Sequence, residues 1–182
     1  MDLKTSLLTE FTYEAFLTRR MLELIPFDKA NWKPHEKSMK LQELALHIAT
    51  IPTWVSRIIT TQELNLATTT ETNFLTSDEQ ESASGQTVQT VNLQNTSQLL
   101  ALFDANTQQA LADVEATTNE DLMQTWTMRD GKKVFFSLPR IAAIRNMAQN
   151  HTVHHRGQLG VYLRLQNIPL PSVYGSTADV MV

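Results

Sequence analysis

The sequence of 182 residues contains no cysteine. This absence excludes disulfides, thiolate metal ligands and a cysteine nucleophile. It is typical of a cytoplasmic protein, and we expect that location. The sequence also lacks an apolar run of about 20 residues, the length that spans a bilayer. Its first residues do not have the pattern of a signal peptide. We therefore expect no membrane partner.

Basic residues are missing from a long central stretch. No lysine or arginine occurs from Ile58 to Met128, whereas ten of the 19 acidic residues lie there. The formal net charge is −4 and the sequence pI is about 5.7. An acidic protein without a basic face is poorly suited to nucleic acid, so no nucleic-acid partner is expected. We interpret the acidic stretch as a solvated flank that favours solubility.

Four segments carry apolar residues at the three- and four-residue spacing of amphipathic helices. They span residues 3–24, 39–60, 97–115 and 139–166. Ser38 is a candidate N-cap for the second helix. Pro52 lies inside that helix and predicts a kink or a restart, because proline has no backbone N–H to donate.

The connections between these helices differ in length and chemistry. Residues 61–96 form a connection long enough to cross the end of a helix bundle. Residues 125–136 contain Asp130-Gly131 between apolar side chains, which predicts a β-hairpin. The fold class predicted for residues 1–182 is therefore all-α, as a single domain. We expect a four-helix bundle with a long crossover between helices 2 and 3 and a small β-hairpin between helices 3 and 4.

Three of the five histidines fall on the apolar faces of these helices. His151 and His155 are one turn apart on the fourth helix, and steps of about 100° per residue place both within its apolar stripe. His47 lies in the middle of the apolar stripe of the second helix. A neutral imidazole must satisfy one N–H and one lone pair, so unpartnered rings in a core are costly. A divalent metal ion accepts three lone pairs at once, and we predict that His47, His151 and His155 bind one.

The remaining candidates have simpler interpretations. His154 falls at the edge of the apolar stripe, and His35 lies in a loop and is expected to be exposed. Gln158 is a candidate acceptor for the outer ring nitrogen of a ligand histidine. Trp54 and Tyr162 share the histidine stripes, where packing is their expected role. An alternative to metal binding is a plain bundle in which the histidines hydrogen-bond to one another or to buried water.

The common catalytic motifs are absent. Thr152 stands where the zinc-protease motif His-Glu-x-x-His has its glutamate, and the sequence has no Gly-rich phosphate loop. Glu43, one turn before His47, is the nearest candidate for a general base. An ion held by three neutral ligands keeps open positions for water or substrate. The leading hypothesis is therefore a metal-dependent enzyme that acts on a small-molecule substrate.

The sequence resembles the DinB/YfiT-like family of four-helix-bundle proteins over nearly its whole length. The resemblance rests on Leu41-Gln-Glu-Leu-Ala-Leu-His-Ile-Ala49, on His151-Thr-Val-His-His-Arg-Gly-Gln158, and on the segment from Ile168 to Asp179. It implies a divalent metal, nickel or zinc, held by His47, His151 and His155. It also implies a homodimer. Some relatives are transferases or isomerases that use a low-molecular-weight thiol, so a thiol is a further expected cofactor.

Two classes of function remain open at this point. The first is a metal-dependent enzyme, either a hydrolase or a thiol-dependent transferase. The lack of cysteine fits the transferase, because any sulfur nucleophile must then come from a cofactor. The second is a non-catalytic metal-binding module with a stress-response or structural role.

Overall fold

A computed structural model describes residues 2–69 and 93–181. The helices are α1 (Leu3–Leu22), α2 (Leu41–Thr50), α3 (Thr53–Thr60), α4 (Thr96–Ala116), α5 (Asn119–Met123), α6 (Arg140–Ile144) and α7 (His151–Leu165). A 3-10 turn, η1 (Phe27–Lys29), follows α1, and a π-helical segment, η2 (Arg145–Asn150), joins α6 to α7. The strands are β1 (Glu63–Asn65), β2 (Thr125–Asp130) and β3 (Lys133–Pro139). The chain is thus mainly helical with one small sheet.

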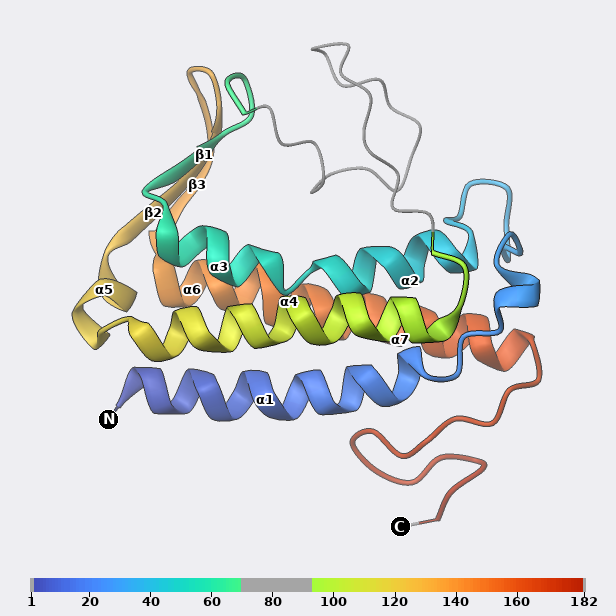
Figure 1. Cartoon of the computed structure of the whole chain (residues 1–182). Helices are drawn as coiled ribbons and strands as arrows, with labels where there is room; N and C mark the ends of the chain where they lie inside the picture. The colour runs from blue at the N-terminus through green and yellow to red at the C-terminus, as the bar shows by residue number, and fades with distance from the viewer. Residues whose placement is uncertain (1, 70–92, 182) are drawn as a thin grey trace.

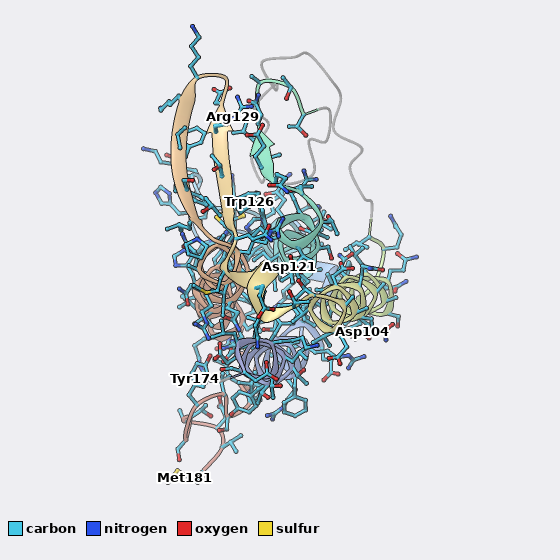
Figure 2. The ribbon with its side chains drawn as sticks, turned by 90° about the vertical axis from the view of Figure 1, so that its left-hand side faces the viewer. Asp104, Asp121, Trp126, Arg129, Tyr174 and Met181 are labelled. Carbon is cyan, nitrogen blue, oxygen red and sulfur yellow. The ribbon has the colours of Figure 1, made fainter. Side chains whose placement is uncertain are left out.

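The long helices lie alongside one another (Figure 1). α4 packs against α1, α2 and α3, and α7 packs against α1 and α2. Arg19 of α1 and Asp104 of α4 form an ion pair across one of these contacts, with 2.9 Å between Nε and Oδ1. Figure 2 looks along the helices and shows the sheet on one side of them and the C-terminal tail, residues 166–181, on the other. Among the described residues, no helix combines the length and the apolar character needed to cross a bilayer.

The second predicted helix is divided at Pro52, as its sequence indicates. α2 ends at Thr50 and α3 begins at Thr53, so the two run nearly end to end (Figure 1). The break releases carbonyl groups at the end of α2, and the Asn106 side chain of α4 donates a hydrogen bond to the Ala49 carbonyl at 2.9 Å. The N-cap prediction is wrong. The helix begins at Leu41, after Lys40 rather than Ser38.

The predicted β-hairpin is confirmed, with its turn one residue further along. Asp130 pairs with Lys133, so the two-residue loop is Gly131-Lys132. Gly131 has φ of +55°, a conformation that glycine adopts without the strain of a Cβ. A third strand was not predicted: β1 pairs in parallel with β2 and places Leu64 opposite Met128. Most of the predicted crossover falls on residues 70–92, outside the described residues.

Two clusters of buried side chains form the core. One lies toward the sheet and includes Trp54, Trp126 and Ile144. The other includes Leu44 and Leu159 and lies farther from the sheet, toward the N-terminal end of α2 and the C-terminal end of α7. Burial of these apolar side chains is the main stabilising contribution to the fold. The two clusters meet along α2 and along the helix that runs from α6 through α7.

Candidate metal centre

The three predicted ligand histidines come from two neighbouring helical stretches. His47 lies on α2, whose buried neighbours Leu44 and Ile51 hold that face of the helix against the core. His151 is the first residue of α7, and His155 lies one turn later. The π-helical segment η2 ends at Asn150, immediately before His151. Single π-helical turns of this kind are frequent at functional sites.

The three imidazole rings converge. Nε2 of His47 lies 3.2 Å from Nε2 of His151. The ring centroid of His155 is 4.5 Å from that of His47 and 4.7 Å from that of His151. One nitrogen from each ring lies within 4.8 Å of the other two. Two nitrogens bonded to one ion at about 2.1 Å lie about 3.0 to 3.4 Å apart, so small side-chain adjustments would let all three share an ion.

Hydrogen bonds on the outer side orient two of the rings. Nδ1 of His155 lies 2.8 Å from Oε1 of Gln158. An amide oxygen only accepts, so Nδ1 donates and Nε2 of the neutral ring keeps its lone pair. Nδ1 of His151 makes a longer contact of 3.3 Å with the carbonyl of Met147. Outer-side acceptors of this kind are typical of metal-binding histidines, and Gln158 occupies the place that the sequence suggested for one.

Burial favours the neutral form of all three rings. Burial, together with the nearby rings of His155 and His151, lowers the pKa of His47 from an ordinary value of 6.5 to about 3. Burial also lowers the pKa of His155 to about 4, although its hydrogen bond to Gln158 acts in the opposite direction. The pKa of His151 is lowered, mainly by burial. A neutral ring retains its lone pair, so all three side chains can bind a cation at neutral pH.

The histidines lie where the two core clusters meet. Ile48 of α2 belongs to one cluster and Ile51, directly after the end of α2, to the other. On the last helical stretch, Ala148 precedes the histidines in the first cluster and Leu159 follows them in the second. The histidine group therefore interrupts the apolar core where the two clusters meet, with His155 buried and His47 and His151 half-buried. Burying the polar nitrogens of these rings costs stability unless each nitrogen has a hydrogen-bond partner or a metal ion.

Comparison with known proteins identifies the family. The sequence model of the DinB family matches residues 1–179. The chain belongs to the DinB family. No curated protein sequence matches it.

Two solved structures share the fold of this DinB-family chain. A DinB-like protein from Bacillus subtilis is 22% identical, with a TM-score of 0.64, over 92% of this chain and 97% of that one. A DinB-like protein from Bacillus cereus is 18% identical, with a TM-score of 0.65, over 92% of this chain and 95% of that one. At these identities the likeness establishes the fold and leaves the chemistry to the site itself.

The other residues suggested by the sequence of this DinB protein lie as follows. His35 is exposed in the loop before α2, and His154 is exposed on α7 beside the histidine group. Trp54 and Tyr162 are both buried in the core clusters, as their packing role requires. The carboxylate of Glu43 accepts a hydrogen bond from the Lys40 backbone N–H at 2.7 Å. Glu43 therefore stabilises the start of α2.

Sequence analysis missed a buried arginine on the opposite side of α7. The helical periodicity places Arg156 on the polar far side, but the side chain is only 3% exposed. It forms an ion pair of 2.7 Å with Glu14 of α1 and also donates a hydrogen bond to the hydroxyl of Tyr174. Tyr174 belongs to the C-terminal tail, and its hydroxyl and its ring both contact the Arg156 guanidinium group. The spacing of residues within one helix carries no information about a tail that folds over it.

Proposed function

We propose that this DinB-family protein binds one divalent transition-metal ion through His47, His151 and His155 and is an enzyme that acts on a small molecule. The observation that carries the proposal is the convergence of three neutral imidazoles, each with a nitrogen within 4.8 Å of the others. Mutual hydrogen bonding accounts for one contact, between Nε2 of His47 and Nε2 of His151. The hydrogen bond from His155 to Gln158 supports a shared ion, because it leaves the lone pair of this third ring on Nε2.

The donor set fits a nickel or zinc ion. Imidazole nitrogen is a suitable ligand for both metals. Three protein ligands leave at least one coordination position for water or substrate, which is the pattern of catalytic rather than structural sites. When bound, such an ion supplies Lewis-acid activation of a ligand at neutral pH. The protein's own contribution is to hold three neutral donors in a largely apolar setting and to fix their tautomers from the outer side.

Two reaction classes are consistent with this centre: hydrolysis and transfer of a low-molecular-weight thiol. The chain has no cysteine, so a sulfur nucleophile would have to be an external thiol. Adding such thiols to the nickel-loaded protein separates the classes. A sulfur-to-nickel charge-transfer band that appears with one thiol supports the transferase. The absence of any band with every thiol tested supports the hydrolase.

Metal titration tests the site itself. Isothermal titration of metal-stripped protein with zinc and with nickel should give one equivalent bound for the wild type. The variants His47→Ala, His151→Ala and His155→Ala should each lose most of the affinity, whereas His35→Ala, which removes an exposed loop histidine, should bind as the wild type does. Binding of less than about a tenth of an equivalent by the wild type would reject the proposal.

The same variants distinguish a catalytic ion from a structural one. If the ion serves only folding, His47→Ala should lower the melting temperature of the metal-supplemented protein by as much as metal removal lowers that of the wild type. If the ion is catalytic, this variant should lose the metal while its melting temperature changes little. The second outcome would exclude the non-catalytic module.

We also propose that the long helices form one four-helix bundle and that the protein is a homodimer. The packing of α4 on α1, α2 and α3, and of α7 on α1 and α2, supports the bundle. Phe16 on α1 and Val161 on α7 are each 58% exposed, and a subunit interface would cover such side chains. Light scattering during size-exclusion chromatography should give about twice the monomer mass of 20.6 kDa. A monomer mass at micromolar concentration would reject the dimer.

A further inference from the structure

His154 lies directly beside the proposed metal centre without belonging to it. Its side chain is exposed on α7, and its ring centroid is 4.8 Å from that of His155. Nε2 of His154 lies 3.1 Å from Nε2 of Gln158. Oε1 of the same Gln158 amide lies 2.8 Å from Nδ1 of His155. The amide therefore bridges an exposed histidine and a buried one.

The chemistry of the amide gives this bridge a direction. The amide nitrogen of Gln158 can only donate, so Nε2 of His154 accepts its hydrogen bond. The amide oxygen can only accept, so Nδ1 of His155 donates to it. A neutral imidazole has one N–H and one lone pair, so the lone pair of His155 must then lie on Nε2. The tautomer of a buried ring is thus set through Gln158 by a side chain at the surface.

Removing His154 would release this constraint. A glutamine amide is nearly symmetric in shape, so Gln158 could turn over and present its NH2 group to Nδ1 of His155. That contact favours the opposite tautomer, in which Nδ1 carries the lone pair and Nε2 carries the hydrogen. A hydrogen on Nε2 removes the lone pair that His155 would offer to the ion. An acceptor at position 154 holds the amide in the productive orientation.

We propose that His154 is a positioning residue that fixes the tautomer of His155 through the Gln158 amide and so prepares Nε2 of His155 to bind the metal ion. The proposal rests on the proposed function, because it assigns His155 as a ligand. The hydrogen-bond relay itself is a property of this chain's own residues and can be measured without a metal.

The primary test is the tautomer of His155 in metal-free protein, read from long-range 1H–15N NMR spectra of histidine-labelled samples at pH 7.5. The wild type should show Nδ1 protonated. The variant His154→Ala should shift the population toward protonated Nε2, and His154→Gln, which keeps an acceptor one turn from Gln158, should restore the wild-type spectrum. His35→Ala is the matched control and should leave the tautomer of His155 as it is in the wild type. An unchanged His155 tautomer in His154→Ala would overturn the proposal.

Zinc titration supplies the second readout. Loss of an outer-side partner typically weakens metal affinity by about 10- to 100-fold. We expect His154→Ala to weaken zinc affinity by about 10-fold, because His154 acts on His155 only through Gln158. His154→Gln should recover most of that loss. An affinity within about twofold of the wild type in His154→Ala would also overturn the proposal. A wild type that binds no metal would reject the proposed function alone, and the tautomer measurement would then decide whether the relay exists.

Discussion

The buried Arg156 offers a quantitative test of how the last helix is held to the rest of the fold. Its guanidinium group donates to the Glu14 carbonyl at 3.1 Å, to the Thr18 hydroxyl at 3.0 Å and to the Glu14 carboxylate at 2.7 Å. Tyr174 adds a hydrogen bond of 2.6 Å from its hydroxyl to the same carboxylate. We predict that Arg156→Met destabilises the protein strongly, because it leaves the Glu14 carboxylate largely buried without its cation.

The size of the loss follows from burial. Breaking a buried ion pair by removing one partner costs about 3–5 kcal/mol. Glu14 is 19% exposed, so water can reach it in part, and we expect the lower end, about 3 kcal/mol. A chain of this size loses about 2–4 °C of melting temperature per kcal/mol, which predicts a fall of about 6–12 °C. The double variant with Glu14→Gln should lose less than the sum of the two single losses, because the pair is coupled.

The chain contains a matched control for this measurement. Arg145 of η2 pairs with Glu10 of α1 at 2.9 Å, but these two side chains are 42% and 40% exposed. An exposed pair contributes less than about 1 kcal/mol, so Arg145→Met should have a small effect. Urea denaturation followed by far-UV circular dichroism measures the loss of stability in Arg156→Met and in Arg145→Met. A chelator is present in each experiment to keep metal out of the comparison. Equal losses in Arg156→Met and Arg145→Met would refute the reasoning from burial.

Two further predictions concern the histidine site and the helix break. The metal-free protein should lose stability as the pH falls from about 6.5 toward 4, because the unfolded chain takes up protons that His47 and His155, with folded pKa values of about 3 and 4, do not. In thermal melts across this pH range, the melting temperature of His47→Asn should fall less steeply than that of the wild type. An unchanged pH profile would contradict the assignment of this pH dependence to His47. Asn106→Ala should cost about 1–3 kcal/mol in urea denaturation, because it leaves the Ala49 carbonyl without its donor. A loss below about 0.5 kcal/mol would show that another group or water replaces Asn106.

Helical periodicity was sufficient to predict the histidine group. His151 and His155 lie one regular turn apart on α7, so steps of 100° place them correctly relative to each other. His47 follows from the apolar stripe of α2 alone. The prediction required only that the two stripes face the same core, which any compact helical packing enforces. The chemistry of Gln158 was also accessible, because positions i and i+3 on a helix are neighbours.

The misses share a physical cause, because each depends on contacts from distant parts of the chain. Arg156 is buried by contacts with α1 and with the C-terminal tail, which no local pattern connects to α7. Gln149 falls on the polar side by 100° steps, yet it is buried, since that side of the helix faces α1, where Gln149 donates a hydrogen bond to Glu10. Strand β1 has three residues, too few for an alternating pattern to be recognised, and its partner β2 lies more than 60 residues away.

X-ray absorption spectroscopy of the zinc-loaded protein tests the metal centre most directly. The extended fine structure of the wild type should fit three imidazole ligands with nitrogen at about 2.0–2.1 Å, and His47→Asn should retain at most two. A wild-type spectrum that fits one imidazole or none would contradict the assignment of His47, His151 and His155 to a single ion.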